Sequence, residues 1–559
     1  MPRPPANKST AGARIRAEGV LAHPLALPFL LWLAVVWAGI ALRPLLPVDE
    51  TRYLSVAWEM WSGGHPLVPH LNGATYAHKP PVLFWLIGAV WTFVGASEIA
   101  ARLVAPAFGF ASIWMVARLA RLLWPGEPAI ARLAPLVFAG TGGFVVYFSL
   151  TMFDLPLTFF ILVALEAVIR AGRGGGWGCW VVCGAALGLG ILTKGPVALL
   201  HVLPAPLLAP LWLRGAPQGG WGRWYRGAAL AVVVCAAVGF AWAIPAAIVG
   251  GKEYADELLW GQTADRMVQS FAHRRPFWWF LPLLPALLFP WAWFPPIWRQ
   301  AWRDRAFPTD AQARLCAVWV VVPLAVFSLI SGKQAHYLLP ELPAAALLAA
   351  RWLCAPASRL ARWDCSLPAL PLLATGLALA ALSLGLVAAP PQAAAVVAKT
   401  SPWIGASVAA IAVALAVTGT VPRLAVAALA MAMALFGIVA NVEVGIALRP
   451  SHDLSAPSAY LAEAVRTGRA LAHGPDYEGE FNYLARLTRP IEIIGGQEPL
   501  PWARAHPRGL LIVTARTGQA GQGLPWQPEA VFPFRGRSVV MWSAEAIVES
   551  NGRVLAGQF

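Results

Sequence analysis

Long apolar runs alternate with short polar linkers over most of the chain. Most of the runs approach the roughly 20 helical residues that cross the hydrocarbon core of a bilayer. They lie at about 24–42, 133–149, 155–170, 176–193, 195–213, 227–250, 277–298, 312–330, 337–355, 367–389, 403–418 and 424–447. A further stretch, 80–117, contains two apolar pieces. The pattern predicts an all-α polytopic membrane protein.

Arginine clusters mark every second linker, and the linkers between them are acidic, mixed or nearly uncharged. Lys and Arg collect in cytoplasmic loops, so the alternation predicts which linkers share a side of the membrane. We expect about 13 transmembrane helices, a cytoplasmic N-terminal tail at 1–23 and an external C-terminus. This count requires 80–117 to cross the membrane once, as one span plus a partial or interfacial helix. The clusters are Arg14/Arg16, Arg118/Arg121/Arg132, Arg170/Arg173, Arg214/Arg223/Arg226, Arg299/Arg303/Arg305, Arg351/Arg359/Arg362 and Arg423.

The same map places a set of polar segments together outside the membrane. They are 43–79, 151–154, 193–196, 251–276, 331–337 and everything after about 448. Within 43–79, Tyr53, Val56, Ala57 and Met60 lie on one face of a helix expected at about 52–62. Such an amphipathic helix is typical of one lying along a membrane surface.

The composition changes sharply after residue 447. Residues 448–559 are polar and rich in Pro and Gly around short apolar patches, a pattern that predicts a small α/β soluble C-terminal domain. Residues 24–447 are expected to form the transmembrane domain, with 43–79 as its long external loop.

The overall composition supports this division. Of 559 residues, 58% are hydrophobic and 12% are charged, whereas a soluble domain carries about 25% charged residues. The net charge of +15 lies in short clusters between apolar runs, which indicates membrane topology and no nucleic-acid partner. The six cysteines lie in or beside apolar runs, which argues against a disulfide framework.

Ionisable residues at the edge of a membrane are costly and are therefore candidates for function. Asp49 and Glu50 follow the first apolar run at its external end, and Asp154 stands at the external end of another. Each carboxylate is in a position to cap a helix. A carboxylate at a membrane-facing cleft is also suited to act as a general base on an acceptor hydroxyl. Both interpretations stay open for these residues.

Two lysines lie beside helix ends on the same predicted side. Lys79, in Tyr76-Ala-His78-Lys79-Pro-Pro, precedes an apolar run, where a cation opposes the helix dipole and an anion is favoured. A phosphate bound there would remove the conflict, and a lysine reaching into water is the alternative. Lys194, in Thr-Lys-Gly-Pro, either occupies a tight hairpin turn or adds a second cation to the site.

Further basic residues lie on the external side against the general trend. The loop 251–276 carries Arg266, and 331–341 places Lys333, His336 and Tyr337 at the start of a span. An anionic headgroup would account for the cations, whereas an interfacial tyrosine and a structural histidine are the ordinary interpretations of the other two. No metal motif or cofactor motif occurs. His65, His70 and His78 share one loop, so a divalent metal stays open.

Taken together, these motifs resemble the GT-C glycosyltransferases, specifically the bacterial aminoarabinose transferase and protein O-mannosyltransferase-like group. The resemblance covers about residues 20–450. It rests on Asp-Glu-Thr-Arg-Tyr at 49–53, Tyr76 with Lys79-Pro-Pro, Asp154, Thr-Lys-Gly-Pro at 193–196 and Lys333 with Tyr337-Leu-Leu-Pro. Similar enzymes transfer a sugar from a polyprenyl-phosphate carrier to an acceptor outside the cytoplasmic membrane.

The resemblance implies a role for each matched position. Asp49 corresponds to the catalytic carboxylate and Asp154 to a second acidic residue near the acceptor. The other matched residues are expected to bind substrate, with Lys79 and Tyr76 on the carrier phosphate; they are Glu50, Arg52, Tyr53, Tyr76, Lys79, Lys194, Arg266, Lys333 and Tyr337. The assignment of Arg266 rather than Arg274 stays open, because the loop 251–276 matches less cleanly.

The implied activity is an inverting glycosyl transfer from a polyprenyl-phosphate-linked sugar to a lipid or glycan acceptor such as lipid A. It would take place at the periplasmic face of a bacterial inner membrane. Two alternatives stay open, a protein O-glycosyltransferase and a transporter or flippase of an anionic lipid. A transporter usually places its binding residues near the bilayer midplane, whereas here the charges gather at one side.

Overall fold

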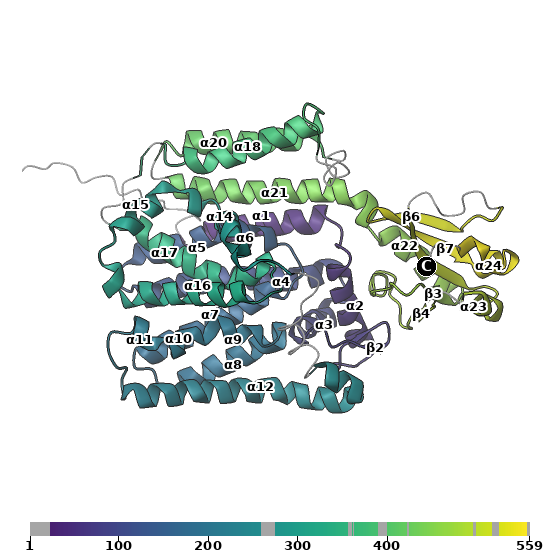
Figure 1. Ribbon diagram of the computed structural model, residues 1–559, viewed down its shortest axis with the longest axis horizontal. Helices are drawn as coiled ribbons and strands as arrows, with labels where there is room; N and C mark the ends of the chain where they lie inside the picture. The colour runs from purple at the N-terminus through teal and green to yellow at the C-terminus, as the bar shows by residue number, and fades with distance from the viewer. Residues whose placement is uncertain are drawn as a thin grey trace, which may run out of the picture.

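The computed structural model describes most of the chain. The described residues are 23–258, 274–355, 360–361, 363–389, 400–421, 424–495, 499–516 and 525–555. They form an elongated molecule, in which a bundle of helices makes up one part and a smaller α/β domain lies beyond one end of the bundle (Figure 1).

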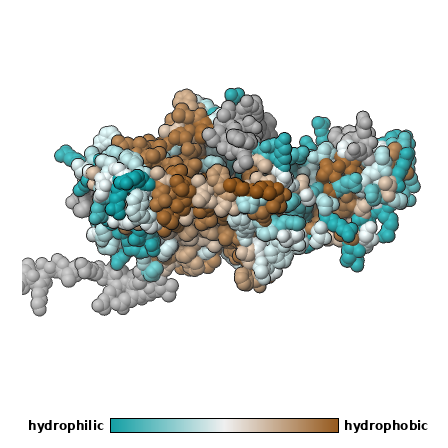
Figure 2. All heavy atoms as spheres, turned by 90° about the horizontal axis from the view of Figure 1, so that it is seen from below, coloured by the Kyte–Doolittle hydropathy of each residue, from teal (hydrophilic) through white to brown (hydrophobic). Residues whose placement is uncertain are grey.

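The bundle has the helices of a multi-pass membrane protein. Among the described residues, 7 helices are long and apolar enough to cross a bilayer. They include α4 (Glu98–Leu123), α7 (Asp154–Gly172), α8 (Trp177–Lys194), α12 (Gly220–Asp256), α16 (Ala311–Leu329), α18 (Ser366–Ser383) and α21 (Ala425–His452). Shorter apolar helices include α1 (Ala26–Leu42) and α20 (Pro402–Thr418). A hydrophobic zone covers the middle of the bundle, with hydrophilic residues toward the ends (Figure 2).

Several predicted runs consist of short helices in series. Prolines, which lack an N–H donor and disturb the preceding turn, lie at or beside most of the breaks, whereas Gly140 and Thr141 separate the first pair of helices. The composite passes comprise α5 (Pro128–Ala139) with α6 (Gly142–Tyr147); α9 (Val197–Val202), α10 (Pro204–Leu207) and α11 (Ala209–Trp212); α14 (Phe280–Leu287) with α15 (Pro295–Arg303); and η6 (Ala335–Glu341) with α17 (Leu342–Leu353). Each of these predicted runs is therefore helical, but it is divided into shorter helices that the length of the apolar run did not predict.

The first and last helices of the bundle pack in parallel. A Cβ on Gly437 would lie 3.5 Å from Val35, and one on Gly445 would lie 2.4 Å from the Leu42 carbonyl. Beyond these contacts, Arg449 Nη2 donates to the same carbonyl at 3.0 Å. Since α1 and α21 advance in the same direction, the start of α1 and the end of α21 lie at opposite ends of the bundle. The odd number of crossings predicted from the charge pattern agrees with this arrangement.

The ambiguous stretch 80–117 contains one crossing helix, α4, and one helix at the bundle end, α3 (Val82–Val94). Before α3, the Lys79 ammonium lies 5.7 Å from the Phe153 ring. After α3, the Ala96 carbonyl accepts from the Tyr483 hydroxyl of the C-terminal domain at 3.2 Å. Both ends of α3 are therefore on the same side of the bundle, so the prediction of one span plus an interfacial helix is confirmed.

The helix predicted along the membrane surface is present as α2 (Asp49–Ser62), but protein covers its apolar face. Tyr53, Val56, Ala57 and Met60 are all buried. They join an apolar cluster with residues of α3 and with Tyr483 of the C-terminal domain. The apolar face of α2 therefore packs against α3 and the C-terminal domain.

Lipid-facing character is clearest on α12 and α18. In each helix, 22% of the most apolar window is buried, and large side chains such as Phe240, Ile248 and Leu377 are exposed. Helix α12 has a break at Gly251, whose φ of 83° lies in the left-handed region that favours glycine. This break lies one residue beyond the end of the apolar run predicted at 227–250.

The C-terminal domain is built on a 5-stranded mixed sheet of order β4-β3-β5-β7-β6. Strands β3 (Leu471–His473), β4 (Glu492–Ile493) and β5 (Leu510–Arg516) are parallel, whereas β6 (Ala530–Phe534) and β7 (Arg537–Ser543) complete the sheet as antiparallel strands. Helices α22 (Ser455–Arg466), α23 (Pro499–Ala505) and α24 (Ala544–Glu549) accompany it. The predicted small α/β unit is present, and α21 continues to His452 before it begins.

The opposite end of the bundle is held by ion pairs of the arginine clusters. Glu166 accepts from Arg118 Nε and from Arg170 Nε, each at 2.6 Å. Arg351 pairs with Asp310 at 2.7 Å and also with Asp304. These arginines therefore have buried or partly buried acidic partners that join helices at this end of the bundle.

The hairpin of α18 and α20 generates a testable prediction. A Cβ on Gly405 would lie 2.4 Å from the Ala380 backbone nitrogen and 2.5 Å from the Gly376 carbonyl oxygen. Because these are backbone atoms of the neighbouring helix, relieving the clash requires the two helices to move apart. We expect Gly405→Ala to destabilise the protein by about 1–3 kcal/mol through overpacking. Thermal unfolding in detergent measures this loss.

Gly239→Ala in α12 is the matched control, because its Cβ would meet nothing within 4 Å. That change should be neutral or stabilising, since alanine favours helix more than glycine does. Equal thermal shifts in the two variants would contradict the close contact between α18 and α20.

Candidate active site at the outer end of the bundle

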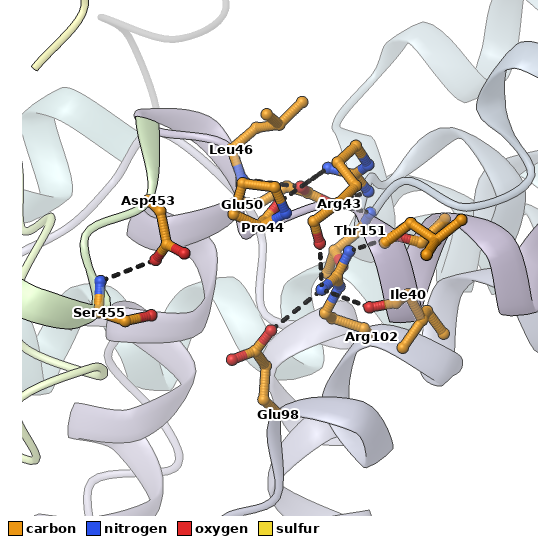
Figure 3. A network of polar contacts seen from close by, with 12 residues as sticks. Ile40, Arg43, Pro44, Leu46, Glu50, Glu98, Arg102, Thr151, Asp453 and Ser455 are labelled. Atoms are coloured by element: carbon orange, nitrogen blue, oxygen red, sulfur yellow. Dashed lines mark hydrogen bonds and ion pairs between the residues drawn. The ribbon is translucent and has the colours of Figure 1, made fainter. Parts of the chain in front are cut away.

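A buried carboxylate organises the end of the bundle that faces the C-terminal domain. Glu50 is 3% exposed and lies in the first turn of α2, where its charge suits the helix dipole. Its carboxylate pairs with Arg43 and accepts from the Thr151 amide at 2.9 Å and from the Leu46 amide at 3.0 Å (Figure 3). Glu50 therefore joins the start of α2 to the end of α1 and to the segment before α7.

Arg102 extends the same network into α4. Its guanidinium donates to the carbonyls of Gly39, Ile40 and Arg43 at 2.9, 3.2 and 3.0 Å, and it pairs with Glu98 at 3.0 Å. The last carbonyls of a helix lack partners within the helix, so this arginine caps the end of α1 (Figure 3). The turn between α1 and α2 is consequently held from two sides.

Asp49 stands next to this network but faces outward. Its side chain is 59% exposed, and its Oδ1 accepts from Arg52 Nη2 at 2.7 Å and from the Tyr53 hydroxyl at 3.3 Å. The two adjacent carboxylates therefore have different surroundings. Glu50 is engaged by buried protein donors, whereas Asp49 has a solvent-accessible carboxylate that a ligand can approach.

The second predicted acid lies at the start of α7. Asp154 is 1% exposed, and its Oδ1 accepts from Lys194 Nζ at the end of α8 at 2.5 Å. Lys194 also lies 5.3 Å from the Tyr337 ring. Three segments that are distant in the sequence therefore meet at this point.

Aromatic rings connect Asp49 to the segment that carries Lys79. The Phe153 ring, beside Asp154, packs edge-on against Tyr53 at 4.9 Å and against Phe84 at 5.6 Å. The Lys79 ammonium lies 5.7 Å from the same ring. Tyr76 is buried and stacks on His78, whose Nε2 lies 3.4 Å from a Glu257 carboxylate oxygen.

His336 lies among these charges, although the sequence analysis gave it only the ordinary interpretation of a structural histidine. Its ring lies 5.0 Å from Tyr337 and 6.0 Å from Tyr147. Burial, together with the neighbouring Lys194 and Lys79, lowers the pKa of His336 to about 4 against the opposing effect of Asp154 and Asp49. His336 is thus neutral near pH 7. A histidine beside a tyrosine in an external turn was the available signal, and that pattern is common in structural positions.

A buried pair fixes the turn that carries His336 and Tyr337. His201 Nδ1 of α9 lies 2.5 Å from Glu341 Oε1, and both side chains are almost fully buried. Phe327 fills the space between them and the site, since its ring lies 5.2 Å from His201 and 5.7 Å from Tyr337. The pair therefore ties η6 to the helix that follows Lys194.

Lys333 and Arg266 are the two remaining basic residues that the sequence predicts to bind substrate. The Lys333 ammonium donates to the carbonyls of Ile330 and Arg275, and burial lowers its pKa. It fastens the bridge between Arg274 and Gly332, so its charged atom has backbone partners. Arg266 lies outside the described residues.

The arrangement suits anion chemistry at a membrane surface. Two ammonium groups, from Lys79 and Lys194, lie beside a neutral histidine, and an accessible carboxylate at Asp49 lies nearby. Cations held in a partly desolvated site stabilise negative charge on a leaving oxygen, and a carboxylate can accept a proton or orient a nucleophile. Among the described residues, no group of three or more His, Cys, Asp or Glu side chains could hold a metal ion.

The long apolar helices of the bundle are those of a multi-pass membrane protein, with a polar site at one end and an α/β domain beyond that end. Comparison with known proteins shows which membrane proteins this chain resembles. A family model described as dolichyl-phosphate-mannose-protein mannosyltransferase matches residues 78–246. That range contains Lys79, Asp154 and Lys194.

Curated relatives match a longer part of the chain. The undecaprenyl phosphate-alpha-4-amino-4-deoxy-L-arabinose arabinosyl transferase 1 of Pseudomonas fluorescens (strain Pf0-1) is 32% identical over 313 residues, which cover 54% of this chain and 52% of that protein. The corresponding transferase of Pectobacterium atrosepticum is 31% identical over 359 residues, or 61% of each chain. The chain spans about half the length of the first curated relatives it matches.

Solved structures match almost the whole chain. The apo structure of ArnT from Cupriavidus metallidurans has a TM-score of 0.72 at 21% identity and covers 93% of this chain and 98% of that chain. The structure of the same protein bound to undecaprenyl phosphate has a TM-score of 0.70 at 20% identity. The fold is that of ArnT, so the predicted GT-C architecture and the resemblance to the aminoarabinose transferases are confirmed.

The Glu50 network predicts acid sensitivity. Burial alone would raise the pKa of Glu50, but Arg43, with Arg102 and the Thr151 amide, lowers it from 4.5 to about 2. A depressed carboxyl pKa contributes stability that is complete above the unfolded value and is lost as the pH falls from about 4.5 toward 2. We expect a loss of about 3 kcal/mol across this window, measured by thermal unfolding in detergent at several pH values.

Glu50→Gln is the control for this prediction. It should be destabilised at pH 7, because it leaves Arg43 without its buried anion, and it should lose less further stability on acidification. An equal dependence on pH in the wild type and in the variant would refute the assignment to Glu50.

Proposed function

We propose that this protein is an inverting glycosyltransferase that takes a sugar from a polyprenyl-phosphate donor and adds it to a cell-envelope acceptor. The site that includes Asp49, Lys79 and Lys194 would face the periplasm from a bacterial inner membrane. The observation that carries the proposal is the accessible carboxylate of Asp49 beside a site with two lysines, at one end of the bundle. The relatives' names support 4-amino-4-deoxy-L-arabinose as the sugar and undecaprenyl phosphate as the carrier.

The proposed division of the chain follows from this site. Residues 24–447 would form the catalytic transmembrane domain, and 448–559 an external domain, with 1–23 in the cytoplasm. The ion-paired arginine clusters at the far end of the bundle support this orientation, because basic linkers favour the cytoplasmic side.

The donor phosphate would bind between the segments that carry Lys79 and Lys194, with Tyr76 and Tyr337 beside it. When the anomeric carbon leaves the phosphate, negative charge develops on the leaving oxygen. Two fixed ammonium groups stabilise that charge in a partly desolvated site. Asp154 holds Lys194 in place through their 2.5 Å contact, so it acts on the phosphate through the lysine.

Asp49 would act on the acceptor from the opposite side of the sugar. With a hydroxyl acceptor, the carboxylate takes the proton as the oxygen attacks the anomeric carbon. With a phosphate acceptor, as on lipid A, no proton needs removal, and Asp49 orients the nucleophile. Attack opposite the leaving phosphate inverts the anomeric configuration in either case.

A protein acceptor is a second candidate, favoured by the family model's description as a protein mannosyltransferase. Lipid transport is less well supported, since Asp49, Lys79, Asp154 and Lys194 lie at one end of the bundle and not at its midplane. Transfer assays that offer lipid A, other envelope glycolipids and peptide acceptors in parallel distinguish these alternatives.

Asp49→Asn and Lys79→Ala test the proposed site. Asn preserves the shape of Asp49 but cannot accept a proton, so kcat should fall about 10²–10⁴-fold with a hydroxyl acceptor, while the donor still binds. Lys79→Ala should mainly weaken donor binding, because it removes an ammonium from the phosphate site. Transfer from labelled polyprenyl-phosphate sugars and direct carrier-binding assays measure the two effects.

Lys252→Ala is a suitable control, since Lys252 is an exposed lysine on α12 beyond the break at Gly251. Full activity in both Asp49→Asn and Lys79→Ala would disprove this site. Carrier binding without transfer to any acceptor would favour lipid transport.

His336 predicts a pH dependence of donor binding. A bound phosphate would favour the protonated imidazole and raise the pKa of His336 above its value of about 4 in the free protein. Because binding then takes up a proton, affinity should rise as the pH falls from 7 toward 5. A sugar phosphodiester is the appropriate probe, since it does not titrate in this range.

His336→Gln should remove this dependence while the site still binds the donor. Equilibrium binding of the same phosphodiester to both proteins at pH 5, 6 and 7 provides the comparison. Affinities that are independent of pH in the wild type would exclude His336 from the phosphate site.

A further inference from the structure

The C-terminal domain is attached to the helix that begins with Asp49. Ser55 Oγ of α2 donates to the Gly479 carbonyl at 2.6 Å and accepts from the Tyr483 amide at 3.0 Å. Trp58 Nε1 donates to the Leu487 carbonyl at 2.7 Å, and the Trp91 and Tyr483 rings stack at 5.2 Å. Residues 478–491 therefore form a docking segment that fixes the position of α2.

The same docking segment reaches the first turn of α2 through a charge. Arg52 Nη1 pairs with Glu478 Oε2 at 2.5 Å, and its Nη2 pairs with Asp49 Oδ1 at 2.7 Å. One guanidinium thus bridges a carboxylate of the C-terminal domain and the carboxylate that the proposed function places at the reacting sugar. The Arg52 side chain is 20% exposed, so water screens this bridge in part.

We propose that Glu478 is a positioning residue, through which the C-terminal domain sets the orientation of Asp49 by holding Arg52. This inference rests on the proposed function for its catalytic meaning. The domain then completes the active site, because a bundle without Glu478 would leave Arg52 to pair with Asp49 alone.

The bridge through Arg52 determines how Glu478 affects Asp49. Asp49 is surrounded by Arg52 and Tyr53 on α2 and by Glu478 from the docking segment, with Tyr76 and His336 farther away. Glu478 neutralises part of the guanidinium charge. Its removal would make Arg52 a stronger partner for Asp49 and draw the carboxylate toward the guanidinium.

Glu478→Gln tests the inference in the full-length protein. We expect kcat for transfer to a hydroxyl acceptor to fall about three- to tenfold, with the donor KM changed less than about twofold, because the phosphate site is untouched. Glu478→Asp should recover part of the lost kcat, since it keeps the charge.

Glu529→Gln is the matched control. Glu529 pairs with Arg469 at 2.7 Å inside the C-terminal domain, so this variant removes a comparable ion pair that does not reach α2. It should leave kcat and the donor KM unchanged. Matching kinetics in Glu478→Gln, Glu529→Gln and the wild type would overturn the inference.

Hydrogen exchange gives a readout that does not depend on activity. The peptide that covers the start of α2, at about 46–56, should exchange several-fold faster in Glu478→Gln than in Glu529→Gln, as the bridge that restrains Arg52 is lost. Unchanged exchange in this peptide would also overturn the inference. Absence of transfer by the wild type would instead defeat the proposed function, so the two failures are distinguishable.

Discussion

The buried ion cluster around Glu50 is the constraint on which the outer end of the molecule depends. Glu50, Arg43 and Arg102 are each at most 3% exposed, and together they join α1, α2, α4 and the segment before α7. Charges buried in this way are tolerable only when donors and acceptors match closely. The cluster therefore fixes the α1–α2 turn, and Asp49 inherits its position as the residue next to Glu50.

From that fixed turn, α2 is restrained by α3 on one side and by the C-terminal domain on another. This arrangement makes the C-terminal domain a structural part of the candidate site. Ser55 and Trp58 supply the docking hydrogen bonds, and Arg52 carries the contact to Asp49 itself. Because α3 stays at the outer surface, its preceding loop can bring Lys79 next to Phe153 and hence near Asp154.

Placing the polar site at the end of the bundle resolves a conflict between charge and lipid. Lys79, Asp154 and Lys194 would be costly in the middle of a bilayer, whereas at the end of the bundle Lys79 is partly exposed and buried Asp154 is paired with Lys194. The long lipid-facing surfaces of α12 and α18 carry no comparable charges in their apolar windows. The helices with the most exposed apolar surface are therefore distinct from the segments that carry the candidate site residues.

The sequence by itself predicted the apolar spans, their sides and most of the candidate residues, because apolar length and arginine position are local features of the chain. Asp49, Lys79, Asp154 and Lys194 could be named as ions at the external ends of helices. Only the tertiary structure separated accessible Asp49 from buried Glu50, placed the Lys333 ammonium on backbone carbonyls, and brought His336 and Glu478 toward the site. Those roles depend on which distant segments pack together, and local pattern carries no information about contacts between residues hundreds of positions apart.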